Sequence, residues 1–138
     1  MKVMVFVQIE PKDETGAMPS EELLAAMGAY NEELVKAGIM LDVGGLKPTS
    51  ECTRIAFHGG TTSVVDGPFT ESKEIVVGYW VWEVGSLEEA VEWARRCPSD
   101  PNDSTTSWLE IRPCLSLEDF LQEQEAKLAE QLRPQQQA

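Results

Sequence analysis

The stretch from residue 64 to residue 84 constrains the fold more than any other part of the chain. It contains a tight turn, Asp66-Gly67-Pro68, in which Asp accepts hydrogen bonds, Gly admits backbone angles closed to other residues and Pro fixes φ. Residues 75–84 then carry β-branched and aromatic side chains at both odd and even positions. Such a strand is apolar on both faces, so we expect both faces to be buried.

The remaining pattern predicts one α+β domain built around that strand. Residues 20–37 and 86–96 have helical periodicity with serine N-caps, and Gly59-Gly60 joins two short strands into a hairpin. The order of strand, helix, strand, inserted hairpin, strand, helix and strand predicts a ferredoxin-like split β-α-β fold, an antiparallel sheet with both helices on one face. We assign residues 1–115 to this domain and residues 116–138 to a C-terminal helical tail. The predicted strands are residues 3–9, 39–46, 52–58, 61–65, 75–84 and 108–112.

The open face of this sheet predicts a homodimer. Residues 3–9 and 75–84 are apolar on both faces while the helices cover only one, so an isolated subunit exposes apolar side chains, among which we place Val5 and Trp80. A second subunit packed face to face against the sheet buries that surface. We therefore expect an obligate dimer joined through the sheets, with the tail reaching the partner through Phe120 and Leu121.

Composition narrows the possible partners. The chain has 11 Lys and Arg against 24 Asp and Glu, and its formal net charge of −13 disfavours nucleic acid and acidic membrane surfaces. We expect residues 1–9 to form a strand and not a signal peptide, and no apolar run approaches the ~20 residues of a membrane span. Cys52, Cys97 and Cys114 lack paired spacing, which is typical of reduced thiols in a cytoplasmic protein. Even with His58 they predict no metal site, and we expect no cofactor.

Asp66 is the candidate catalytic residue, and two roles are open for it. A carboxylate at a strand end beside Phe69 is partly desolvated, which raises its pKa and suits a general base. Alternatively, Asp66 accepts backbone hydrogen bonds within its own turn, a role that also explains Gly67 and Pro68.

The candidate ligand-binding residues are Tyr30, Phe69, Lys73 and Tyr79. Lys73 either orients an anionic substrate or belongs to a solvated charged loop. The two tyrosines either offer hydroxyl groups to a pocket between helix and sheet or are core residues. His58 is either a proton shuttle or an exposed strand end. The four tryptophans either line an aromatic ligand site or, for Trp80 and Trp82, pack at a subunit interface; they are Trp80, Trp82, Trp93 and Trp108.

The same turn carries a resemblance to a known family. Residues 66–74, followed by Gly78-Tyr79-Trp80, are similar to the signature of the YCII-related, or DGPF-domain, family of small bacterial proteins. The resemblance covers nearly the whole chain to Pro113. It extends to Ala37-Gly38 with Gly45-Leu46 and Pro48, to residues 87–90 and to residues 110–113.

This resemblance implies the dimeric α+β barrel superfamily, in which two ferredoxin-like subunits pack sheet against sheet, and it implies no established reaction. Some family members are encoded near, or fused to, alternative sigma factors, and a few relatives act on small aromatic or lactone compounds. Better-studied relatives have a His-Asp pair proposed as catalytic. The predicted first helix, residues 20–37, contains no histidine, so that pair does not carry over to this chain.

Two classes of function follow. The first is a dimeric small-molecule-binding or regulatory module, with an apolar ligand between helix and sheet in each subunit. The second is an enzyme for proton transfer, isomerisation or elimination on a small cyclic or aromatic acid, with Asp66 as base and Lys73 or a tyrosine stabilising the oxyanion. We favour the first, because the sequence contains no visible catalytic pair.

Overall fold

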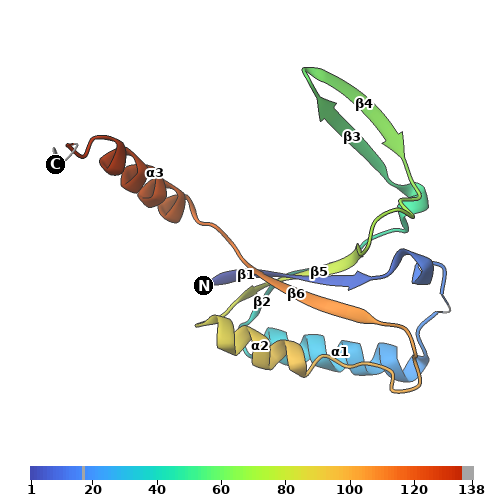
Figure 1. Cartoon of the computed structure of the whole chain (residues 1–138). Helices are drawn as coiled ribbons and strands as arrows, with labels where there is room; N and C mark the ends of the chain where they lie inside the picture. Colours follow the sequence, from blue (N-terminus) through green and yellow to red (C-terminus); the bar gives the residue numbers. More distant parts are fainter. Residues whose placement is uncertain (17, 135–138) are drawn as a thin grey trace.

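The predicted ferredoxin-like fold is confirmed. The computed structural model describes residues 1–16 and 18–134, and its centre is a four-stranded antiparallel sheet with strand order β2-β5-β1-β6. Helices α1 and α2 lie on the same face of this sheet, and the other face is open (Figure 1). The elements are β1 (Lys2–Ile9), α1 (Glu21–Lys36), β2 (Met40–Gly45), β3 (Thr53–His58), β4 (Thr61–Asp66), β5 (Ile75–Glu83), α2 (Leu87–Arg95), β6 (Ser107–Pro113) and α3 (Leu117–Gln131), with short 3-10 turns at Pro11–Asp13 and Thr49–Glu51.

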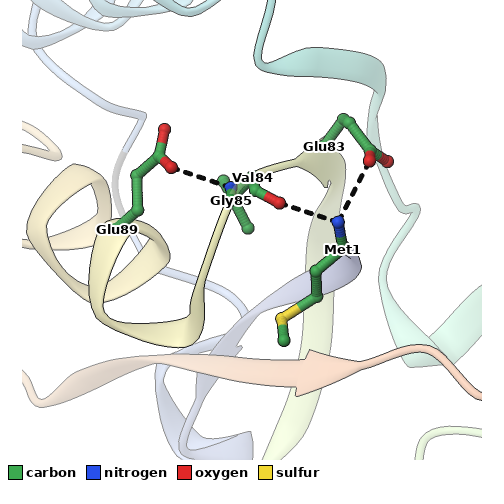
Figure 2. Close-up of polar contacts among 5 residues, drawn as sticks. All are labelled: Met1, Glu83, Val84, Gly85 and Glu89. Atoms are coloured by element: carbon green, nitrogen blue, oxygen red, sulfur yellow. Dashed lines mark hydrogen bonds and ion pairs between the residues drawn. The ribbon is translucent and has the colours of Figure 1, made fainter.

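Local signals in the sequence set the helix ends. The Ser20 Oγ accepts a hydrogen bond from the Leu23 backbone N–H at 3.1 Å, and Gly38 follows α1 with a φ of 72°, which favours glycine. At α2, Ser86 caps in the same way, while the Glu89 carboxylate accepts from the Gly85 N–H at 2.8 Å (Figure 2). The Glu89 side chain therefore satisfies the N–H of Gly85, one residue before the N-cap Ser86, and not the N–H of Ser86 itself as in a capping box.

The ends of β1 and β5 are tied together beside this cap. The Met1 backbone nitrogen donates to the Val84 carbonyl at 2.8 Å and to the Glu83 carboxylate at 3.1 Å (Figure 2). These contacts fix the end of the sheet from which α2 begins.

The core lies between the sheet and the two helices. Val3, Val5 and Trp82 are fully buried and pack against Leu34 of α1 and Ala90 of α2. No helix in the described part of the chain is long and apolar enough to cross a membrane.

The assignment of Val5 and Trp80 to the open face was wrong. These residues pair directly across β1 and β5, and both are buried on the helix-covered face, with Val5 at 0% and Trp80 at 3% exposure. Trp80 and Trp82 therefore pack in the core of their own subunit and not at an interface. The error has a physical source: a strand that is apolar on both faces does not reveal which alternate set of side chains faces the helices.

The open face presents the other set of side chains. Met4 pairs with Val81, and Phe6 pairs with Tyr79. Because side chains along a strand point alternately to its two faces, these four point away from α1 and α2, and all four are only partly buried. On β6, the charged Arg112 and Glu110 lie opposite Met4 and Phe6. The open face thus has an apolar centre and a charged edge.

Two elements project from the sheet on this open side: the β3–β4 hairpin and α3 (Figure 1). Every residue of both elements is exposed. The hairpin is connected through β5 at the end where Ile75 pairs with Ile9, whereas α3 follows β6 at the end where Pro113 pairs with Val3. The two elements therefore leave opposite ends of the sheet.

Candidate functional site

A cavity of about 330 Å³ lies between the sheet and the two helices, and it is the candidate ligand site. Its walls come from β1, β5, β6, α1 and α2 and the segment that follows α2, so most of it is built on regular elements. Of the described residues that line it, none is charged. They are Val7, Leu23, Met27, Trp80, Ala94, Cys97, Pro98, Ser99, Ser107, Trp108 and Leu109.

Sulfur atoms contribute the polarisable part of the lining. The Cys97 Sγ lies 4.0 Å from the Met27 Sδ and 3.7 Å from the Pro98 carbonyl oxygen. Burial raises the pKa of the Cys97 thiol above its usual value, because the thiolate loses solvation there. The thiol is therefore protonated at neutral pH and behaves as a small apolar group.

Two hydrogen bonds hold the aromatic side chains beside the cavity. The Trp80 Nε1 donates to the Asn31 Oδ1 at 2.9 Å, which satisfies the polar edge of the indole and leaves its ring as apolar surface. The Tyr30 hydroxyl donates to the Trp93 carbonyl oxygen at 2.6 Å and thereby links α1 to α2. Tyr30 and Trp80 pack edge to face, with ring centroids 6.0 Å apart.

A larger hollow of about 550 Å³ shares Leu23 with this cavity, but its chemistry differs. It is lined mainly by loop residues with Lys12, Asp13, Asp100 and Asp103 among them. The Thr105 backbone N–H donates to the Asp103 carboxylate at 2.9 Å and lowers the pKa of Asp103. Small-molecule sites are usually apolar with a few polar groups, so the smaller cavity is the better candidate.

The Asp66-Gly67-Pro68-Phe69 turn forms the base of the hairpin. Thr49 donates its backbone N–H and its hydroxyl to the Glu14 carboxylate, and the Phe69 N–H donates to the Thr49 Oγ1 at 3.3 Å. The Gly67 N–H donates to the Cys52 carbonyl at 2.8 Å, and the Gly67–Pro68 peptide is cis. A Cβ at Gly67 would lie 1.7 Å from the Thr49 carbonyl oxygen, so only glycine fits there.

The structure places Asp66 at the exposed end of β4. Its carboxylate accepts a hydrogen bond from the Thr53 hydroxyl at 3.1 Å, across the hairpin, and not from the backbone of its own turn, which was the alternative role considered for it. The turn is held instead by backbone groups of Gly67 and Phe69. Asp66 is exposed, so the structure does not show the partly desolvated carboxylate that the hypothesis of a general base assumes. That role for Asp66 stays a prediction.

The four residues predicted to bind a ligand are not brought together. Tyr30 lies on the helix-covered side of the sheet, whereas the Tyr79 ring lies against Gly44 on the opposite face. Phe69 and Lys73 belong to the loop before β5, where the Arg54 guanidinium stacks 3.7 Å from the Phe69 ring centroid. His58 is exposed at the tip of the hairpin.

Sequence reasoning identified part of the cavity lining and missed the rest. Among the four tryptophans considered for an aromatic site, Trp80 and Trp108 line the cavity. Leu23 and Met27 contribute to the helical periodicity of residues 20–37, but such spacing indicates that they face the core and does not indicate a cavity beside them. Ala94, Cys97 and Leu109 carry no sequence signal for a site, because an unfilled space depends on how helix and sheet fit together.

Fold and site define a ferredoxin-like α+β domain with a hairpin inserted before its third sheet strand and an apolar cavity beneath its sheet. The model of the YCII-related domain matches residues 1–113, and the chain belongs to this family. It is also 37% identical over 93 residues to an uncharacterised protein of Rhizobium meliloti (strain 1021). That alignment covers 67% of this chain and 73% of the relative. The family resemblance found in the sequence is confirmed.

Proposed function

We propose that this YCII-related protein is a dimeric small-molecule-binding module, in which each subunit holds a small neutral apolar ligand in its helix–sheet cavity. The observation that carries this proposal is the lining of the cavity, which combines Trp80, Met27 and Leu109 with no charged residue. A volume of about 330 Å³ lies at the lower end of the ~300–1,000 Å³ typical of ligand pockets. The ligand is therefore small.

The chemistry of the lining selects against charged ligands. A carboxylate or sulfonate that enters this cavity loses its hydration, and the lining residues offer no cation to replace that hydration. The hydroxyl groups of Ser99 and Ser107 and the Cys97 thiol supply only neutral polar contacts. This selectivity separates the binding module from an enzyme that acts on a small acid.

The open sheet face and the two projecting elements support the dimer. Phe6 and Tyr79 form the centre of an apolar face, and the hairpin and α3 carry large apolar side chains in solvent. Exposed apolar patches on soluble proteins often mark sites of protein–protein contact. A second copy packed against the open face buries this surface.

A pair of fluorescent probes tests the binding function. N-phenylnaphthylamine is neutral, and anilinonaphthalene sulfonate is the same aromatic skeleton with an anionic group. We expect the neutral probe to bind at one site per subunit and to quench Trp80, and the sulfonate to bind at least ~10-fold more weakly because its charge is desolvated.

Matched variants locate the probe. Ala94→Leu fills part of the cavity and should abolish probe binding, whereas Ala25→Leu makes the same change at an exposed position of α1 and should not affect it. Equal affinities for the two probes, or probe binding that survives Ala94→Leu, would contradict the proposed site.

A further inference from the structure

The exposed helix and the exposed hairpin are complementary surfaces of the same chain. On α3, Leu117, Leu121 and Leu128 recur at helical spacing and form one apolar stripe, which continues to Leu132. On the hairpin, Ile55 pairs directly with Val64, and Phe57 lies two residues further on, so these three side chains share one face. These seven side chains are between 50% and 78% exposed.

Neither element is expected to be stable in isolation. A helix of about 12–15 residues is marginal in water without tertiary packing, and a single two-stranded hairpin is marginal as well. α3 has 15 residues and a capping box between Ser116 and Asp119, yet every residue in it is exposed. Both elements would therefore be stabilised by a packing contact, which the described residues of a single chain do not supply.

We infer that α3 of each subunit packs its leucine stripe on the Ile55, Phe57 and Val64 face of the partner's hairpin. This inference rests on the proposed dimer and specifies how its two subunits hold each other. Both surfaces are then covered by the same partner, a second copy of this chain.

The topology of the sheet supports this pairing. α3 and the hairpin leave opposite ends of the sheet, on its open side (Figure 1). When two sheets pack face to face around a two-fold axis that runs across the strands, opposite ends are exchanged. The α3 of one subunit then meets the hairpin of the other at each end of the dimer, and both contacts are identical by symmetry.

Charge disfavours the alternative in which α3 meets α3. The helix carries five acidic side chains and one lysine, so two such helices side by side repel each other. The strands of the hairpin carry only Arg54 and Asp66 as charged residues, and both lie near its base. The acidic α3 is therefore repelled less by the partner's hairpin than by the partner's α3.

The area is of the right order for a stable dimer. Burying a large aliphatic or aromatic side chain contributes about 1.5–3 kcal/mol, and at about 25 cal/mol per Å² this equals roughly 60–120 Å² of apolar surface. Seven such side chains that are at least half exposed give about 250–550 Å² per subunit, against about 800 Å² per partner in a standard interface. The open face around Phe6 and Tyr79 supplies a further part of the difference.

Photocross-linking in the full chain tests this contact. Phe57→p-benzoylphenylalanine keeps an aromatic ring at the tip of the apolar hairpin face, and irradiation should give a product of two-chain mass. We expect mass spectrometry to map the link to residues 117–132. The same photoreactive residue at His58, on the opposite face of the hairpin, is the matched control and should give at least ~10-fold less of this product.

A second pair of variants, combined with the Phe57 probe, separates specific packing from proximity. Leu128→Asp places a charge in the proposed contact and should reduce the cross-link at least ~5-fold, whereas Ala126→Asp, on the far side of α3, should not. A link within one chain, a link that maps outside α3, or a yield unaffected by Leu128→Asp overturns the inference. If light scattering still gives a two-chain mass, the dimer stands and only the contact is wrong; a one-chain mass overturns both.

Discussion

At the scale of single residues, two buried groups make the helix–sheet layer sensitive to high pH. Burial raises the pKa of the Tyr30 hydroxyl, and it also raises the pKa of the Cys97 thiol. In both cases the protonated, neutral form is favoured in the folded protein. The unfolded chain therefore releases these protons first as the pH rises.

The sign of the pH effect follows from this order. The stabilisation is fully present below the unfolded pKa values of about 8.5 for Cys and 10 for Tyr, and it is lost as the pH rises towards the folded values. We expect the free energy of unfolding, measured by urea titration, to be constant between about pH 7 and 8 and to fall above about pH 9. Cys97→Ala should flatten the first part of this fall and Tyr30→Phe the later part.

Tyr30→Phe should also lower stability by about 1 kcal/mol at pH 7, since the Trp93 carbonyl loses the hydrogen bond from the Tyr30 hydroxyl and keeps only the one from the Arg96 N–H. If both variants keep the full pH dependence of the unmodified protein, these groups do not cause it.

At the scale of elements, the base of the hairpin depends on one glycine. Gly67→Ala forces a Cβ against the Thr49 carbonyl, and we expect it to cost about 1–3 kcal/mol and to expose the hairpin to proteolysis. Gly45→Ala is the matched control, because a Cβ at Gly45 has no heavy atom within 4 Å beyond its chain neighbours. Thermal melts and limited proteolysis compare the two. Equal behaviour would mean that the turn at Gly67 relaxes without cost.

The elements also show what the sequence was able to predict. Ser20, Gly38 and Ser86 act through hydrogen bonds and backbone angles within a few residues, so helix ends and the hairpin turn at Gly59-Gly60 were predictable. The face on which Val5 and Trp80 lie depends on which alternate set packs on the helices, and local sequence does not contain that information. The cavity beside Met27 arises from the fit between the two helices and the sheet, which no single segment encodes.

At the scale of the whole molecule, neighbouring residues of β1 separate folding from assembly. Val5→Asp buries a carboxylate in the core of the subunit and should prevent folding, as followed by circular dichroism. Phe6→Asp places the same charge on the open face, where it should leave the subunit core intact and weaken the dimer at least ~10-fold. A folded Val5→Asp protein, or a Phe6→Asp protein that dimerises normally, would contradict this assignment of faces.

The dimer is the claim on which the open face, the two projecting elements and their proposed contact all depend. Light scattering on a size-exclusion column measures the mass of the unmodified protein directly. We expect a dimer, with twice the 15.3 kDa of one chain, at micromolar concentration, in spite of a net charge of −13 on each subunit. A single stable species of 15.3 kDa under these conditions would contradict it.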